Sequence, residues 1–90
     1  MKTVCEITGI SEETVKGPRR QHRFVRARQM VCFLLHELRP KMSFPQIGAF
    51  MNRDHTTVMN SVKKVRALLD ERDEETEQLY QEARRRLVMR

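Results

Sequence analysis

The 90-residue sequence is short of the residues that build large cores, membrane spans and cross-linked scaffolds. It contains no Trp, only 6% aromatic residues, and no apolar run near the ~18 residues of a membrane span. Its two cysteines, Cys5 and Cys32, form no CxxC pair, which argues against a disulfide framework and fits a reducing compartment. The start, MKTVCEITG, has no apolar core of a signal peptide. We expect one small cytoplasmic domain, mostly helical, with no membrane partner.

The sequence also lacks the motifs of a nucleotide-driven or metal-dependent enzyme. No G-x-x-x-x-G-K-[ST] motif occurs, so no P-loop and no ATPase module are predicted. Asp54-His55 resembles a base dyad, and Cys32 with His36 resembles half a metal site, but catalysis needs more converging groups and zinc normally takes four ligands. We therefore predict no enzyme, no catalytic residue, no metal and no cofactor, with Cys32 in the core.

Positive charge is what the chain has in excess. The net charge is +6 and the pI is near 10.0, which indicates an anionic partner, nucleic acid before membrane. Residues 16–41 hold eight Lys/Arg against one Glu, and residues 43–66 hold four against one Asp. Residues 67–83 reverse this, with seven acids against one Arg. One side of the domain is therefore expected to face phosphate.

Helix-start and helix-stop residues predict an all-α, compact multi-helix bundle that forms a single domain over residues 1–90. Gly9 ends a first helical segment, Ser11 caps a second, and Gly17-Pro18 stops it. The expected elements are short helices in 3–16, a basic arm in 19–23, a long helix in 24–38, a helix-turn-helix with helices in 43–51 and 54–70, and a C-terminal helix in 74–87.

The first helix of the predicted helix-turn-helix is marked by local chemistry. Ser43 is an N-cap candidate and Pro45 falls in the first turn, where a missing N–H costs nothing. Asn52-Arg53 form the turn, and Asp54 caps the following helix. Gly48 inside a helix costs roughly 1 kcal/mol against Ala, so we expect a close approach of the second helix there.

The second helix of this pair has two faces. Its apolar stripe recurs at helical spacing and consists of Val58, Val62, Val65 and Leu69. Thr56, Asn60 and Lys63 lie on the opposite face, which offers hydroxyl, amide and ammonium groups. An ordinary amphipathic surface helix has the same pattern, but so does a helix that reads the DNA major groove.

A dense basic run, RRQHRFVRARQ, precedes the helix-turn-helix. Arg19 and Arg20 are expected in an arm, and Arg23, Arg26 and Arg28 are expected off the buried stripe of the long helix. That buried stripe is predicted to contain Ala27, Met30, Val31, Leu34 and Leu38. Such a run is often only a solvated face, but beside a helix-turn-helix it indicates phosphate contact.

The segment IGAFMNRDHTTVMNSVKKV, with RARQM and Phe44-Pro45 before it, resembles the DNA-binding domain (domain IV) of the bacterial replication initiator DnaA. The resemblance covers nearly the whole chain and is strongest over residues 24–65. The family implies a Trp-repressor-like helix-turn-helix fold. The chain departs from the family at Met51-Asn52, where paired glycines are common, at Asn60, where His is frequent, and at His36, where Lys is frequent. These departures affect the preferred site and some phosphate contacts rather than the docking mode.

The resemblance also implies a DNA-contact set. Asp54, His55 and Thr56 would touch base edges in the major groove, and Arg20 would enter the adjacent minor groove. The residues implied to contact the DNA backbone are Arg28, Gln29, Phe44, Pro45, Thr57, Asn60 and Lys64. Further candidates for phosphate contact are Arg19, Arg23, His36, Arg53 and Lys63. The implied ligand is a short, asymmetric, A·T-rich duplex box of the kind that initiators bind.

The expected function is therefore sequence-specific binding of double-stranded DNA, as a monomer, in replication initiation or its regulation. Two alternatives remain open. A phage or mobile-element regulator of transcription or transposition would use the same helix-turn-helix. A protein-interaction module would use the acidic 67–83 segment and the stripe of Leu79, Tyr80 and Leu87. A protein partner is unknown, and the expected location is the cytoplasm, in association with the nucleoid.

Overall fold

The structure, a computed structural model that describes residues 1–88, is all-helical, which confirms the expected fold class. No strand occurs in this range. The helices are α1 (Lys2–Thr8), α2 (Glu12–Lys16), α3 (His22–Leu38), α4 (Phe44–Met51), α5 (His55–Asp70) and α6 (Glu74–Val88). None of these helices is long and apolar enough to cross a membrane.

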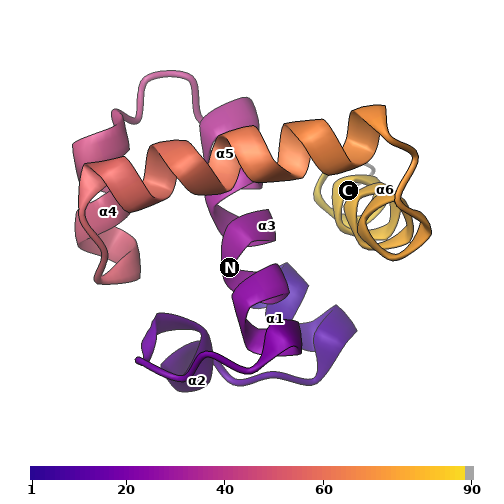
Figure 1. Ribbon diagram of the computed structural model, residues 1–90, viewed down its shortest axis with the longest axis horizontal. Coiled ribbons are helices and arrows are strands. Elements are labelled where there is room, and N and C mark those ends of the chain that lie inside the picture. The colour runs from indigo at the N-terminus through magenta and orange to yellow at the C-terminus, as the bar shows by residue number, and fades with distance from the viewer. Residues whose placement is uncertain (89–90) are drawn as a thin grey trace.

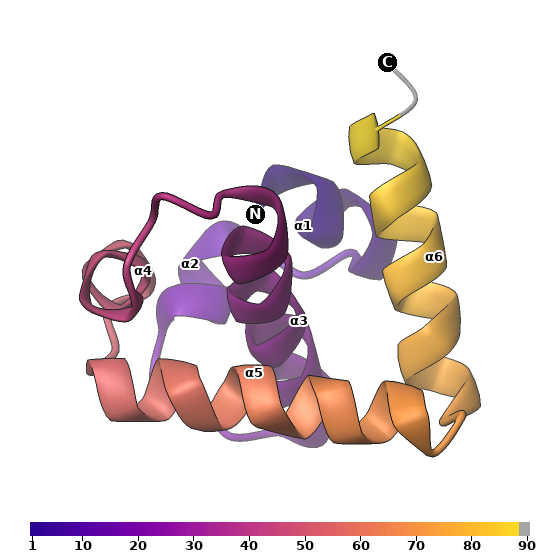
Figure 2. The ribbon, with the colours of Figure 1, turned by 90° about the horizontal axis from the view of Figure 1, so that it is seen from above.

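The long helices α3 and α5 cross and form the centre of the molecule. In Figure 1, α5 runs across the view with α4 at its beginning and α6 at its end. Seen from above in Figure 2, α6 turns away from α5 at a steep angle. The short helices α1 and α2 pack against α3, and α1 also packs against α6. The helix-turn-helix pair α4–α5 thus rests on a support built from α1, α2, α3 and α6.

The core collects apolar side chains from every helix. Its largest fully buried members are Met30, Ile47, Met51, Val4, Val15, Val31, Val58 and Val65. Burial of such side chains supplies the main favourable free energy of folding, roughly 1.5–3 kcal/mol for each fully buried Val, Ile or Met. On α5, the stripe continues to Leu68, which is buried, whereas Leu69 is only half-buried. The predicted stripe was therefore wrong by one residue in its last turn.

The turn between α4 and α5 is built by the residues that mark it in the sequence. The Ser43 hydroxyl accepts from the Gln46 amide N at 3.2 Å, and the Gln46 Oε1 accepts from the Ser43 amide N at 2.8 Å, a reciprocal capping box. Asn52 ends α4 in the left-handed region, with φ 59°. Asp54 Oδ1 then accepts from the Thr57 amide N at 2.8 Å and opens α5.

Gly48 is required by packing against this turn. A Cβ at Gly48 would collide with the carbonyl oxygen of Arg53 and would lie 3.3 Å from the carbonyl carbon of Asp54. The chain entering α5 therefore passes directly over Gly48, and the expected close approach is confirmed. Its cost in helix propensity is offset by the tight pairing of the two helices.

The basic arm ends two residues earlier than the sequence indicated. Helix α3 begins at His22, two residues before the expected start, with Gln21 as its N-cap residue. Arg23 consequently lies in the first turn of α3, and its guanidinium carbon is 5.2 Å from the ring centre of Phe24. The stretch between α2 and α3 is residues 17–21, and we call this stretch the basic arm from here on.

Candidate nucleic-acid interface

The start of α5 presents its polar side chains to solvent. Asp54, His55, Thr56 and Thr57 are all exposed there, and Asn60 is exposed one turn later. Hydrogen bonding from the Thr57 amide N, the largest influence, lowers the pKa of the Asp54 carboxyl. Asp54 is therefore ionised at neutral pH and caps α5 while it stays open to solvent. The structure thus brings the three predicted major-groove residues together at one exposed helix end.

Other residues that were predicted to contact the DNA backbone or its phosphates lie on α3, α4 and α5. Lys63 and Lys64 are exposed on α5, and Pro45 is exposed at the start of α4. Phe44 is half-buried because its ring stacks on His36, with ring centres 4.9 Å apart. Gln29 is half-buried on α3. The DNA contacts of these residues remain predictions.

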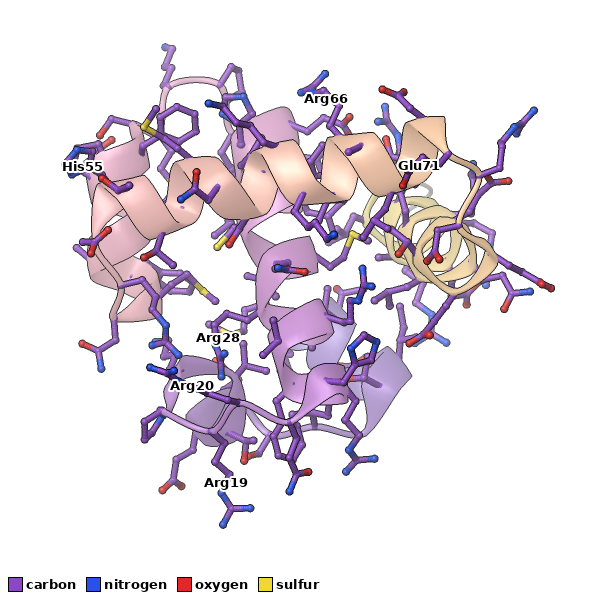
Figure 3. All side chains as sticks on the ribbon, in the orientation of Figure 1. Arg19, Arg20, Arg28, His55, Arg66 and Glu71 are labelled. Carbon is purple, nitrogen blue, oxygen red and sulfur yellow. The ribbon has the colours of Figure 1, made fainter. Side chains whose placement is uncertain are left out.

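The basic arm lies on the same side of the molecule as α5. In Figure 1 the segment that joins α2 to α3 crosses the near side of the molecule below α5, and in Figure 2 it passes at the same edge of the molecule as α5. Arg19 and Arg20 are exposed on this segment, and Figure 3 shows Arg19 pointing away from the body of the protein. Arg20 lies nearer to Arg28, toward the half of the molecule that carries His55. One face of the domain therefore presents both predicted groove-reading elements.

A basic cleft separates the arm from the start of α5. Its volume is about 710 Å³, and its charged lining residues are Lys16, Arg20, Arg28 and Arg53, with no acidic residue among those that line it. The side chains of Asn52 and Thr57 complete its α5 side. A cleft with only positive lining charges attracts a phosphate group.

Arg28 does not lie off the buried stripe as expected. The residue is only 7% exposed, and its guanidinium donates to four main-chain carbonyls. The shortest bonds run from Nε to the Val15 oxygen at 2.6 Å and from Nη2 to the Arg19 oxygen at 3.0 Å. Burial, and then the positive charge of Arg53, lower the pKa of Arg28. The sequence pattern was wrong here because the carbonyl ends of α2 supply polar partners inside the fold.

Arg53 also binds main-chain carbonyls. Its Nη1 donates to the Lys16 oxygen at 2.9 Å, and its Nη2 donates to the Gly17 oxygen. Nη1 also lies 3.0 Å from the carbonyl oxygen of its neighbour Asn52. The guanidinium therefore joins the turn of the helix-turn-helix to the end of α2. Arg53 remains a candidate for phosphate contact, because a guanidinium has five N–H donors.

Sequence reasoning missed Lys16 and Asn52 as members of this surface. Lys16 Nζ lies 4.4 Å from the ring centre of Phe50, which is 41% exposed on α4. This contact holds the lysine beside the cleft. The only sequence signal for Lys16 was its place at the start of the basic segment, and Asn52 was noticed only as a turn residue.

Cys32, which together with His36 resembles half a metal site in the sequence, lies inside the protein. Within residues 1–88, no group of three His, Cys, Asp or Glu side chains is placed to hold a metal ion. Cys32 is buried, and its burial raises the pKa of the thiol to about 11, so the thiolate is a minor form at neutral pH. Cys32 is thus an apolar core residue.

Comparison with known proteins identifies the family. The family described as bacterial dnaA protein helix-turn-helix matches residues 1–65. The chromosomal replication initiator protein DnaA of Mycobacteroides abscessus is 38% identical over 74 residues, which make up 82% of this chain and 15% of that protein. The chain therefore spans a small part of the initiator's length. Because both matches are to a replication initiator, a phage or mobile-element regulator and a protein-interaction module are not favoured. The chain belongs to the family of bacterial DnaA helix-turn-helix domains.

Proposed function

We propose that this domain binds duplex DNA at a short, asymmetric, A·T-rich box of the initiator type, and that it serves replication initiation or its control. The start of α5 enters the major groove, and the basic arm enters the adjacent minor groove. One observation carries this proposal. The exposed α5 start and the exposed arm lie on one face, on either side of a cleft lined by four basic side chains and no acidic one.

Base preference in the major groove comes from the exposed end of α5. The first turn of a recognition helix penetrates deepest, and Thr56 offers a methyl group suited to the thymine methyl. A carboxylate accepts more than one hydrogen bond, so Asp54 can cap α5 and still accept from a cytosine amino group. His55 lies between them and is exposed. These three side chains are the proposed base readers.

Preference for A·T-rich DNA comes from the arm. A·T-rich duplexes have a narrow minor groove with enhanced negative potential, which attracts an inserted arginine. Arg20 is exposed on the arm and lines the basic cleft, so it is the proposed minor-groove residue. Phosphate contacts from Lys63, Lys64 and the α4 start would fix the register without reading sequence.

Binding is proposed to be monomeric and independent of nucleotide hydrolysis. One α5 and one arm read different grooves, so a single copy matches an asymmetric site. The 90-residue sequence contains no P-loop motif, so this segment carries no ATP-binding signature of its own.

Selection of binding sites from a random duplex pool tests the proposal. The salt concentration is held at one value within about 0.1–0.2 M, near the physiological ionic strength. We expect enrichment of one asymmetric, A·T-rich box, bound with one protein per duplex in a titration followed by sedimentation. A pool that shows no enrichment over its input would refute sequence-specific binding. A two-fold symmetric site occupied by two proteins would refute the monomeric arrangement.

A further inference from the structure

We infer that Arg53, together with Arg28, positions the basic arm relative to the start of α5, so that the two proposed groove-reading elements keep a fixed separation. The inference rests on the proposed function for its consequence on DNA. The arrangement itself is a property of the free protein. It gives Arg53 a role in the turn of the helix-turn-helix that is separate from any direct contact with DNA.

The first observation is where Arg53 makes its hydrogen bonds. Arg53 lies one residue before the α5 cap, yet its guanidinium reaches across the cleft to the Lys16 and Gly17 carbonyls. Gly17 is the first residue of the arm. A single side chain therefore connects the residue next to the proposed base readers with the base of the arm. The planar guanidinium donates to both carbonyls from its two terminal nitrogens, which a lysine ammonium does not reproduce.

The second observation is that Arg28 holds the same segment from the other side. Its Nη2 donates to Gly17 O at 3.1 Å and to Arg19 O at 3.0 Å. The Gly17 carbonyl thus accepts from both arginines. Arg28 belongs to the centre of α3, which packs on α5. The base of the arm is consequently fixed to α3 through Arg28 and to the turn before α5 through Arg53. Arg20 is the one charged residue of the arm that lines the cleft.

The third observation concerns charge. Burial, and after it the positive charge of the neighbouring Arg53, lower the pKa of Arg28. Within residues 1–88, neither guanidinium forms an ion pair with a carboxylate. Main-chain carbonyls satisfy their hydrogen bonds but do not neutralise two charges. A phosphate in the cleft, which carries one negative charge, would offset part of this positive charge, and the pair therefore joins arm placement to the passage of the DNA strand.

A positioned arm changes binding in a defined way. An arm that is already ordered in the free protein does not lose its conformational freedom on binding, so the contribution of Arg20 is realised in full. Without Arg53, the arm would sample many positions and Arg20 would enter the minor groove at an entropic cost. The contribution of Arg20 should then shrink, while base preferences read by α5 persist.

The experiment compares Arg53→Met with wild type in the full chain, first without DNA. Limited trypsin digestion reports opening of the arm through cleavage after Arg19 and Arg20, since cleavage follows the population of the open form. We expect the initial cleavage rate to rise at least about tenfold, the factor expected for loss of one charge-assisted hydrogen bond. Arg66→Met is the matched control, because Arg66 is exposed on α5 and covers the Phe33 ring without touching the arm.

The second measurement is a mutant cycle on the selected DNA box. Arg20→Ala should weaken binding several-fold in wild type but less than twofold in the Arg53→Met background. In the Arg53→Met variant, the sequence preference at the base pairs read by α5 should stay unchanged. The preference at the base pairs contacted through the minor groove should become weaker. A purely structural role would lower both sets of preferences together.

Arg53→Lys keeps the test decisive if the Met variant fails to fold, as judged by circular dichroism. Lysine retains the charge but donates from one nitrogen, so we expect faster arm cleavage than in wild type with an unchanged salt slope. A wild-type cleavage rate in every Arg53 variant that folds, or an Arg20→Ala effect equal in both backgrounds, would overturn the inference. Failure of wild type to prefer any box would refute the proposed function alone, because the digestion result needs no DNA.

Discussion

The two ends of α5 have opposite chemistry. At the N-terminal end of α5, exposed Asp54, His55 and Thr56 face solvent beside a basic cleft. At the C-terminal end of α5, near Glu71, the chain is acidic and turns into α6, whose first turn carries Glu74, Glu75 and Glu77. Figure 3 shows His55 and Glu71 at the opposite ends of the helix. One helix thus joins a surface suited to DNA with a surface that would repel it.

The arginines of the two regions are also used differently. Within residues 1–88, all four ion pairs include Arg72 or an arginine of α6. Arg84 pairs with Glu37 at 2.6 Å, and Arg85 and Arg86 both pair with Glu82. The arginines of the arm and the cleft form no such pair in this range. The local balance of charge, rather than the number of arginines, therefore separates a candidate phosphate surface from a self-neutralised one.

The largest expected effect concerns the start of α5, where the proposed base-reading residues lie. The double variant His55→Ala/Thr56→Ala should lose about 2–6 kcal/mol of preference for the selected box, because each base contact contributes roughly 1–3 kcal/mol. Binding to scrambled duplexes should change little. The measurement is a pair of equilibrium titrations, with box and scrambled DNA, at one salt concentration.

The control for this variant lies at the other end of the same helix. Glu71→Ala removes an exposed acid far from the proposed readers and should leave the box preference unchanged. Equal weakening of the double variant on box and scrambled DNA would show that His55 and Thr56 do not read bases.

The second effect concerns the packing of α4 against the turn that precedes α5. Gly48→Ala should destabilise the fold by about 1–3 kcal/mol, since its Cβ would meet the main chain of Arg53 and Asp54. Helix propensity alone predicts the opposite sign, a gain of roughly 1 kcal/mol. Urea denaturation of the free protein decides between them.

The neighbouring Ala49 supplies the matched control in the same helix. It is exposed, so Ala49→Gly should cost only about 0.5–1 kcal/mol through helix propensity. A stability gain in Gly48→Ala would mean that α4 and the turn before α5 can separate without loss.

The smallest expected effect distinguishes free charges from paired ones. Lys64→Ala should lower the slope of log K against log salt by about one unit, as expected for one lost phosphate contact. Arg85→Ala should leave the slope unchanged, because Arg85 is bound to Glu82 on α6, away from the proposed DNA contacts. Titrations at several salt concentrations measure both slopes, and identical slopes for Lys64→Ala and wild type would remove Lys64 from the phosphate-contact set.

The sequence was sufficient for the elements that local chemistry defines. Ser11, Ser43 and Asp54 cap helices as expected, and Gly9 ends α1 in the left-handed region with φ 74°. The resemblance to a known family named the exposed residues at the start of α5. The capping and helix-ending signals depend on neighbours within a few positions along the chain.

The sequence was insufficient where distant main-chain atoms act as partners. Arg28 binds carbonyls 9–14 residues away, and Arg53 binds carbonyls 36 and 37 residues away. Side-chain periodicity does not contain that information, so Arg28 was expected on the surface. The early start of α3 was missed for a related reason, because Gln21 caps it without any side-chain hydrogen bond.

The length of the basic arm limits the kind of DNA site that one molecule can occupy. Residues 17–21 are held between α2 and α3, so five residues form a loop anchored at both ends. Fully extended, five residues span at most ~17 Å, and a doubly anchored loop projects no more than about half of that. Successive major and minor grooves are centred roughly 17 Å apart, half a helical turn. The loop with one arginine side chain thus reaches the neighbouring groove only, and a site with a variable spacer between its two halves would be out of reach.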